Sequence, residues 1–386
     1  MRVIHVITRL ILGGAQENTL ATVTGLRSRH DLDVTMISGP TEGSEGSLEA
    51  QAKAVPGMLT VIPSLVRPVQ PWMDLSSVVS LFRRFRAARP HVVHTHSGKA
   101  GIVGRVAAWA AGVPVVVHGI HGPSFGAFQG ATANAVFLTA ERLAGRMTSH
   151  FVVVAQAMAR QYLAAGIGHP DQYTRVFSGF DLAPYLAVDR SEALRRQLGW
   201  GAEHFVVGKI ARLFELKGHE DLIAAAPSMV RDNPNVRFLL VGDGPWRVAL
   251  EEEVRNRGLS SHVHFAGLVP PASVPEYLGV MDLLVHLSRR EGLARALPQA
   301  LAAGRPVLAY DCDGANEVCL NGRTGFLIPV GNIHALRDRV RLLAKDPRLR
   351  REFGERGREM VRELFPVDRM VDDQYELYRR LCLEAA

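Results

Sequence analysis

Two cations lie five residues apart in the segment G-K-I-A-R-L-F-E-L-K-G, at Arg212 and Lys217. The segment follows an apolar run rich in β-branched residues and precedes a helical pattern, so both cations are expected in a strand-to-helix loop. Arginine can hold a phosphate through two parallel hydrogen bonds, and lysine adds a point charge. The pair therefore suits a diphosphate, with two solvated loop cations as the alternative interpretation.

A second candidate segment, R-E-G-L-A-R-A-L-P-Q-A-L, follows the expected strand 283–286 and opens a helix. We expect Glu291 at the entrance of that helix and Gln299 two turns further on, within reach of a ribose hydroxyl. The backbone amides between them would present positive partial charge to a phosphate or a hydroxylated ligand. Those amides belong to Gly292, Leu293, Ala294 and Arg295.

A glycine pair, Gly13 and Gly14, follows the first expected strand. Glycines there would let the backbone turn tightly and bring the N–H groups of a helix start against an anion. A plain turn after a strand has the same composition. The dinucleotide fingerprint G-x-G-x-x-G is absent from the sequence, which counts against NAD or FAD.

Four histidines lie near the ends of two expected strands: His94, His96, His118 and His121. They alternate with apolar strand residues and lack the His-x-x-x-His spacing of a helical zinc site, so we expect no metal there. His121 is the best candidate for a polar group that faces a ligand, with a satisfied loop histidine as the alternative. The segment 311–313, D-C-D, resembles a metal-binding D-x-D pair, but it is expected in a loop near a base or ribose.

The elements that must position these residues alternate between short apolar strands and helical patterns, which indicates parallel sheets covered on both faces. The series restarts near residue 204, so we predict two Rossmann-like domains in tandem, joined by a linker at 181–190. The first domain is expected to span 1–183 plus a final amphipathic helix at 367–386, and the second 184–366. The expected strands are 3–7, 34–37, 92–94, 115–118, 151–154, 205–211, 237–241, 263–265, 283–286, 306–310 and 325–328.

Composition limits the function classes. The chain has 386 residues, of which 47% are apolar and 22% charged, as in globular proteins. Three cysteines without a C-x-x-C pair indicate a reducing compartment. We expect neither a signal peptide, because Arg9 and the Gly13-Gly14 pair interrupt the first apolar run, nor a spanning helix, because about 20 uninterrupted apolar residues are lacking. We therefore expect a cytoplasmic protein. The pI near 9.6 is accompanied by no nucleic-acid reader motif, so nucleic acid is not an expected partner.

The positive charge is concentrated in the first half. Residues 1–183 hold 16 Lys and Arg against 10 Asp and Glu, and residues 184–386 hold 29 against 28. Within this half, residues 74–89 form a helical pattern with an apolar stripe that is expected to pack on a sheet. Arginines on the other side could instead attract anionic lipid headgroups, at about 1 kcal/mol per cation. The stripe is Leu75, Val78, Val79, Phe82 and Phe85, and the arginines are Arg83, Arg84, Arg86 and Arg89.

Taken in order, these motifs resemble family 4 of the retaining glycosyltransferases, whose fold is called GT-B. The resemblance covers essentially the whole chain and rests on seven motifs in sequence. They are the early Gly-Gly loop, H-T-H-S-G-K-A-G, the next H-G, S-G-F-D at 178–181, R-x-x-x-x-K-G, V-G-D-G-P at 241–245, and the E-x7-E block followed by A-A-G-R-P-V. In this fold a cleft separates the two domains, and the last helix crosses back to the first domain.

The resemblance implies that Arg212 and Lys217 bind the donor diphosphate and that Glu291 contacts the donor sugar. It also implies that amides near Ala294 and Arg295 hold phosphate or sugar and that Gly14 approaches the diphosphate. His121 matches a histidine that positions the transferred sugar. One residue departs from the pattern: the second glutamate of the block is Gln299, which lacks the charge that strengthens a bond to ribose, at a loss of about 1 kcal/mol.

The resulting hypothesis is a retaining, metal-independent transferase that moves a hexose from a nucleotide diphosphate sugar to a hydroxyl acceptor. A UDP-sugar is the favoured donor, and a lipid-linked or polysaccharide intermediate is the expected acceptor, with contact to an anionic membrane at the inner face of the plasma membrane. No cofactor is expected. Alternatives are a non-catalytic nucleotide-sugar-binding subunit and a sugar-nucleotide epimerase. A glycan phosphorylase would need a lysine that binds pyridoxal phosphate, and the sequence shows no suitable context for one.

Overall fold

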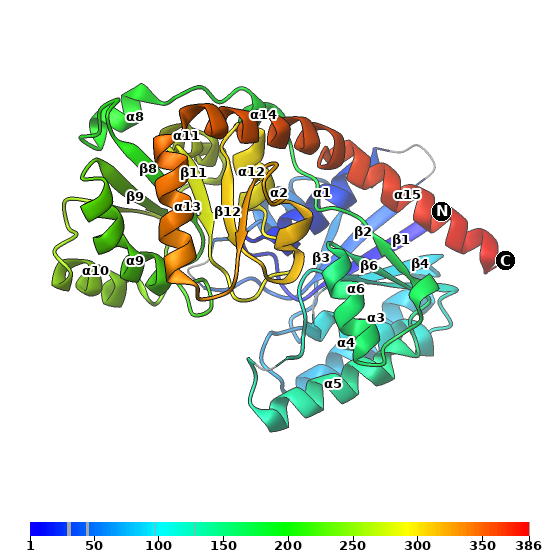
Figure 1. Cartoon of the computed structure of the whole chain (residues 1–386). Coiled ribbons are helices and arrows are strands. Elements are labelled where there is room, and N and C mark those ends of the chain that lie inside the picture. The colour runs from blue at the N-terminus through cyan, green and yellow to red at the C-terminus, as the bar shows by residue number, and fades with distance from the viewer. Residues whose placement is uncertain (29–31, 44–45, 97, 127, 386) are drawn as a thin grey trace. The chain divides into compact units, whose positions relative to one another are not determined.

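The computed structural model describes residues 1–28, 32–43, 46–96, 98–126 and 128–385, and Ser97 of the histidine motif lies outside them. The chain forms two compact units (Figure 1). Unit 1 comprises Met1–Phe180 and Val367–Ala386, and unit 2 comprises Asp181–Pro366. Each unit is a parallel sheet with helices against it, as predicted from continuous apolar strands between helices.

Unit 1 has a seven-stranded parallel sheet in the order β3-β2-β1-β4-β5-β6-β7. The strands are β1 (Arg2–Ile7), β2 (Asp33–Ser38), β3 (Leu59–Val61), β4 (Val92–His96), β5 (Val115–Ile120), β6 (His150–Val153) and β7 (Tyr173–Arg175). The helices are α1 (Gly14–Arg27), α2 (Glu49–Lys53), α3 (Pro71–Ala88), α4 (Gly98–Ala110), α5 (Ala131–Gly145), α6 (Gln156–Ala164), the 3₁₀ turn η1 (Pro170–Gln172) and α15 (Val367–Glu384). The short edge strands β3 and β7 are absent from the sequence-based expectation.

Unit 2 has a six-stranded parallel sheet in the order β10-β9-β8-β11-β12-β13. The strands are β8 (Phe205–Ile210), β9 (Val236–Val241), β10 (Val263–Gly267), β11 (Leu283–His286), β12 (Val307–Tyr310) and β13 (Gly325–Ile328). The helices are α7 (Ala183–Leu186), α8 (Glu192–Gln197), α9 (His219–Asp232), α10 (Arg247–Asn256), α11 (Val274–Val280), α12 (Ala296–Ala302), α13 (Ile333–Lys345) and α14 (Pro347–Leu364), with 3₁₀ turns η2 (Pro271–Ser273) and η3 (Asp313–Glu317). The expected linker therefore contains a short helix, α7.

The two faces of the unit 1 sheet bury different sets of side chains because neighbouring strand residues point to opposite faces. Val3 and Ile7 of β1 join a core with α1 and α15, whereas Ile4 and Val6 join a core with α3 and α4. By the same alternation, His5, His94 and His96 lie on the α15 face. His118 lies on the α4 face, so the four histidines of the sequence motif do not share one side of the sheet.

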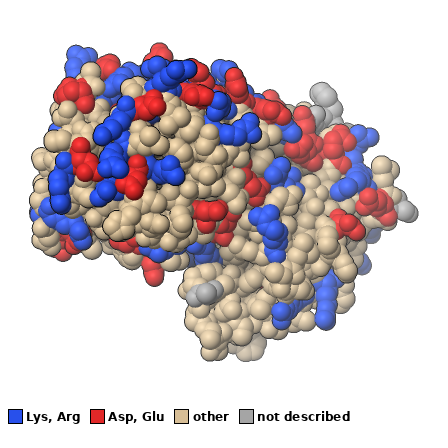
Figure 2. Space-filling model, viewed as in Figure 1, with Lys and Arg blue, Asp and Glu red and all other residues tan. Residues whose placement is uncertain are grey.

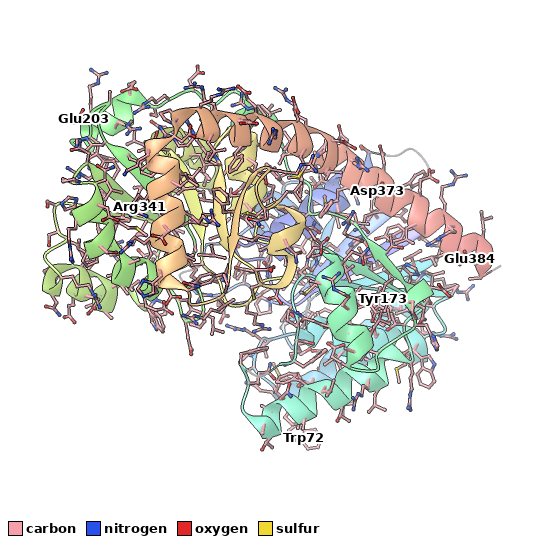
Figure 3. The ribbon with its side chains drawn as sticks, viewed as in Figure 1. Trp72, Tyr173, Glu203, Arg341, Asp373 and Glu384 are labelled. Atoms are coloured by element: carbon pink, nitrogen blue, oxygen red, sulfur yellow. The ribbon has the colours of Figure 1, made fainter. Side chains whose placement is uncertain are left out.

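Helix α3 differs from the predicted amphipathic helix. Leu81 and Phe85 are buried in the core, but Leu75 and Val79 of the expected packed stripe are 55% and 38% exposed. Trp72, at the outer edge of unit 1 (Figure 3), is 83% exposed. The helix therefore has a second apolar surface that faces solvent. Every helix among the described residues is too short or too polar to cross a bilayer.

A buried ion pair joins α4 to α5. The Arg105 guanidinium and the Glu141 carboxylate are 2.6 Å apart, and neither side chain is exposed. The second carboxylate oxygen of Glu141 accepts a 2.8 Å hydrogen bond from the Ser124 hydroxyl, in the loop that follows His121. The pair thus helps to hold that loop.

We predict that Glu141→Ala lowers the free energy of unfolding by about 3–5 kcal/mol, because it leaves the buried Arg105 guanidinium without its carboxylate. The urea midpoint of unit 1 reports this change. Asp373→Ala is the matched control, since Asp373 pairs with Arg369 at 4.0 Å on the solvent-facing side of α15 and its loss should cost about 0.5 kcal/mol or less. Equal midpoints for the two variants would contradict the role of the buried pair.

Candidate functional site

The loop between β8 and α9 carries Arg212 and Lys217, as predicted. Leu216 and Gly218 both have positive φ, at 66° and 67°. A Cβ atom on Gly218 would lie 2.1 Å from the Leu287 carbonyl oxygen, so only glycine permits the loop to pack this closely on the end of β11. The Arg289 N–H donates to the Leu216 carbonyl at 2.8 Å. The cations are therefore held on a backbone that is tied to the neighbouring strand.

Lys217 forms an ion pair with Glu291, which comes from the loop after β11. Their side chains are 22% and 31% exposed, so both charges remain partly open to solvent. The Glu291 N–H donates to a carboxylate oxygen of Asp313 at 2.7 Å. Asp313 has a positive φ of 49° and follows β12. The loops after three neighbouring strands thus converge on one charged pair.

Helix α12 begins later than predicted. Its first residue is Ala296, so Gly292, Leu293, Ala294 and Arg295 precede the helix, and their amides belong to a loop. Gln299 lies on α12, where its side-chain amide donates to the Tyr185 hydroxyl at 2.9 Å. In the D-C-D segment at 311–313, the Asp313 carboxylate accepts a hydrogen bond from the Glu291 N–H, which gives this aspartate a structural role.

The glycine pair in unit 1 does not form the tight turn that we expected. Gly13 is extended, with φ −178° and ψ 156°, and Gly14 is the first residue of α1. The backbone bends at Leu12 and Gly13, directly before the helix, but neither glycine takes the positive φ that would require glycine. Gly14 is still at the start of a 14-residue helix, next to the end of β1.

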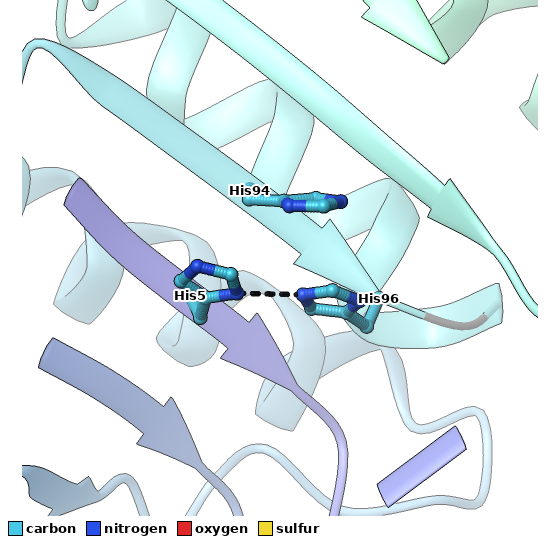
Figure 4. Close-up of side chains that lie close together, drawn as sticks. All are labelled: His5, His94 and His96. Atoms are coloured by element: carbon cyan, nitrogen blue, oxygen red, sulfur yellow. Dashed lines mark hydrogen bonds between the residues drawn. The ribbon is translucent and has the colours of Figure 1, made fainter. Parts of the chain in front are cut away.

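His121 follows β5 and bonds to a second histidine. Its Nε2 lies 3.0 Å from His96 Nδ1, and His96 Nε2 lies 2.9 Å from His5 Nδ1. Figure 4 shows the latter bond and the ring of His94 beside it. Burial lowers the pKa of His121 to about 4 and that of His5 to about 3, so both rings are neutral at pH 7. Ring nitrogens of His5, His94 and His96 lie within 4.8 Å of one another.

A buried lysine beneath the unit 2 site was missed by the sequence analysis. Lys209 of β8 is fully buried, and its Nζ has no hydrogen-bond partner among the described residues. His219 Nδ1 and His286 Nε2 are likewise buried without a hydrogen-bond partner among the described residues. Burial, followed by the charge of Lys217, lowers the pKa of Lys209 to about 7. Its only sequence signal is a charge inside the apolar strand F-V-V-G-K-I.

Comparison with known proteins places both units among transferases. Residues 13–178 match the model "Glycosyl transferase 4-like domain", and residues 190–360 match "Glycosyl transferases group 1". A GDP-mannose-dependent alpha-mannosyltransferase of Mycobacterium tuberculosis is 31% identical over 72% of this chain and 71% of its own. The UDP-Gal:alpha-D-GlcNAc-diphosphoundecaprenol alpha-1,3-galactosyltransferase of Escherichia coli is 25% identical over 98% of this chain and 96% of its own.

Solved structures agree on the fold. HepE of Anabaena, crystallised with UDP, matches with a TM-score of 0.83 and 23% identity over 98% of this chain and 100% of its own. A sucrose-phosphate synthase of Thermosynechococcus elongatus matches with a TM-score of 0.81 and 22% identity over the full length of both chains. The two parallel-sheet units therefore have the GT-B fold that the sequence predicted.

We predict that the free energy of unfolding of wild type, minus that of Lys209→Met, rises by roughly 1.4 kcal/mol per pH unit between about pH 7.5 and 9. Over this range the unfolded state holds a proton on Lys209 that the folded state has released, since the folded pKa is about 7, so raising the pH favours folding. Urea unfolding at three pH values measures the difference. Parallel pH profiles for wild type and variant would contradict a depressed pKa at Lys209.

Proposed function

Because the chain belongs to the group 1 glycosyltransferases, with a glycosyltransferase 4-like first half, we propose the reaction its residues support best. The enzyme is a hexosyltransferase that uses a nucleotide diphosphate sugar. In the proposed reaction, the hexose moves to a hydroxyl of a lipid-linked or polysaccharide intermediate, its anomeric configuration is retained and no metal is required. The observation that carries the proposal is the ion pair between Lys217 and Glu291, on the loop that also holds Arg212.

The chemistry follows from where charge develops. As the sugar–phosphate bond breaks, the sugar gains positive charge and the leaving diphosphate gains negative charge. Arg212 and Lys217 would stabilise the diphosphate in the transition state, which is the largest contribution available to preorganised charges. In this role the two cations would replace a divalent metal.

Glu291 would have two functions in this arrangement. Its carboxylate neutralises Lys217 in the free enzyme, and with donor bound it would accept hydrogen bonds from sugar hydroxyls. Asp313 holds the Glu291 backbone, so the carboxylate is presented from a fixed loop. Gly292, Leu293, Ala294 and Arg295 would contribute loop amides to the phosphate or sugar.

The proposed donor base is uridine. The relative from Escherichia coli is named for a UDP-sugar, and the HepE structures contain UDP, whereas the mycobacterial relative is named for GDP-mannose. Gln299, held by Tyr185, would bind ribose through a neutral amide instead of a carboxylate. Gly13 and Gly14 would approach the diphosphate from unit 1, and His121 would position the transferred sugar.

A lipid-linked acceptor is supported by α3. Its solvent-facing surface is lined by Trp72, Leu75, Ser76, Val79, Ser80, Arg83, Arg84 and Ala87, so apolar side chains adjoin two arginines. Asp74 of α3 forms an ion pair with Lys99 of α4, which holds the two helices together. In Figure 2 most of the visible surface of the lower part of unit 1 is uncharged, with a few Lys and Arg at one side. The apolar and basic side chains of α3 suit an anionic membrane surface. The relative from Escherichia coli is named for an acceptor linked to undecaprenol through a diphosphate.

We predict that Arg212→Ala lowers kcat for release of UDP from a UDP-sugar by about 10²–10³-fold, because the leaving diphosphate loses a charged donor. The melting temperature should stay near that of wild type. Arg341→Ala, on the outer surface of α13 (Figure 3), is the matched control and should leave kcat unchanged. Turnover of the Arg212 variant close to wild type would refute the assigned diphosphate contact.

We predict that the protein sediments with phosphatidylglycerol vesicles and not with phosphatidylcholine vesicles. Arg83→Glu with Arg84→Glu should weaken this binding at least tenfold, since each cation contributes about 1 kcal/mol near the surface. The matched control reverses two exposed arginines of α15, Arg379 and Arg380, and should bind as wild type does. Equal sedimentation with both lipids, or equal loss in both variants, would rule out α3 as the membrane surface.

A further inference from the structure

A continuous chain of hydrogen-bonding groups links α15 to His121 across the unit 1 sheet. The Tyr378 hydroxyl donates to Gln374 Oε1 at 3.0 Å and lies 3.4 Å from His5 Nε2. His5 Nδ1 then meets His96 Nε2 at 2.9 Å, and His96 Nδ1 meets His121 Nε2 at 3.0 Å. Tyr378, His5 and His96 are at most 1% exposed, so water does not interrupt the chain.

Each imidazole in the chain is neutral. Burial lowers the pKa of His5 to about 3 and that of His121 to about 4, and it lowers the pKa of His96 well below 6.5. Further protonation is disfavoured as well, because a charge on one ring would repel a charge on the next. A neutral imidazole has one N–H donor and one lone pair. Each bond in the chain therefore has a direction, and each direction determines the next.

The direction follows from a single proton. Tyr378 has one hydroxyl proton, which it donates to the Gln374 carbonyl oxygen, so every other group near its oxygen must donate to it. His5 must therefore carry its proton on Nε2 and accept at Nδ1. His96 then donates from Nε2 and accepts at Nδ1, where His121 donates from Nε2.

His94 provides an internal check on this assignment. Its Nδ1 lies 2.5 Å from the same Tyr378 oxygen and must donate to it, which leaves Nε2 as a bare lone pair. Among the described residues His94 Nε2 has no hydrogen-bond partner, as the assignment requires. A proton on Nε2 would instead be a buried donor without an acceptor, which costs more than an unused lone pair.

We propose that Gln374, Tyr378, His5 and His96 are positioning residues that hold His121 in its Nε2–H tautomer. His121 then presents the Nδ1 lone pair and acts as a hydrogen-bond acceptor for a hydroxyl of the sugar or of the acceptor substrate. This rests on the proposed function, in which His121 contacts substrate. The selectivity that follows is for a substrate group that donates, so a deoxy or methoxy analogue at that hydroxyl would lose the bond.

The same three rings are poorly arranged to bind a metal. His5 Nδ1 and His96 Nε2 already share a hydrogen bond (Figure 4), and a metal would require both lone pairs at once. A Cβ atom on Gly119 would lie 3.0 Å from His94 Nε2, so the strand leaves little room at that nitrogen, and His96 Nδ1 is already bonded to His121 Nε2. Stoichiometric zinc in the purified protein would overturn the proposal.

The direct test is the tautomer of His121 in the free protein. Long-range ¹H–¹⁵N correlation spectra of ¹⁵N-histidine-labelled protein at pH 7 separate protonated from unprotonated ring nitrogens, and His121→Gln assigns the signal. We expect Nε2 protonated and Nδ1 bare. A His121 with its proton on Nδ1 would contradict the proposed directions of these hydrogen bonds. Because no turnover is needed, failure of the proposed reaction would leave this result unaffected.

Variants distant from His121 test whether the chain sets its tautomer. Tyr378→Phe removes the acceptor for His5, so His121 should become a mixture of tautomers and kcat should fall about fivefold, the effect of one hydrogen bond. UDP affinity should not change. His118→Asn is the matched control, because His118 lies on the opposite sheet face and its Nδ1 bonds Thr95. An unchanged His121 tautomer in the Tyr378 variant would refute the coupling.

A second pair at His96 keeps the test valid if Tyr378→Phe does not fold. The side-chain amide of His96→Asn lies where Nδ1 was, so its oxygen can still accept the His121 proton. His96→Leu cannot accept it. We expect the Nε2–H tautomer in the asparagine variant and a mixture in the leucine variant. The same tautomer ratio in both variants would mean that His96 has only a packing role.

Discussion

In unit 2 the strand order reverses between β8 and β11, which places the carboxyl ends of these two strands side by side. The Lys217–Glu291 ion pair spans this point and joins residues 74 positions apart in the sequence. Its geometry depends on the sheet, because the loops that carry it are tied to each other at Leu216 and Arg289. The proposed diphosphate site of Arg212, Lys217 and Glu291 therefore depends on the formation of this sheet.

Unit 1 reverses its strand order in the same way, between β1 and β4. At this reversal unit 1 has neutral imidazoles, whereas unit 2 has charged side chains. His5 and His96 come from these two strands, and α15 supplies Tyr378 from the end of the chain. The proposed role of the charged pair in unit 2 is to bind phosphate, and that of His121 in unit 1 is to accept a hydrogen bond from a hydroxyl.

Much of this organisation could be predicted from the sequence because central parallel strands are continuous apolar runs. The edge strands β3 and β7 are only three residues long and carry no such pattern. Motif spacing located Arg212 and Lys217 correctly in a loop, but it placed Glu291 at the start of α12, which begins five residues later. Periodicity did not distinguish the two apolar surfaces of α3, and it gave no sign that Lys209 is buried or that His118 and His96 point to opposite faces. These depend on which elements pack together.

The central claim, a diphosphate site that needs no metal, is tested most directly by calorimetric titration of wild-type protein with UDP, GDP, ADP and TDP in EDTA. The account predicts binding of one nucleoside diphosphate, with UDP favoured, at an affinity that magnesium does not change. At 100 times its Kd that nucleotide should also stabilise the protein by about 2.7 kcal/mol. Binding only in the presence of magnesium, or no binding of any nucleotide, would contradict it.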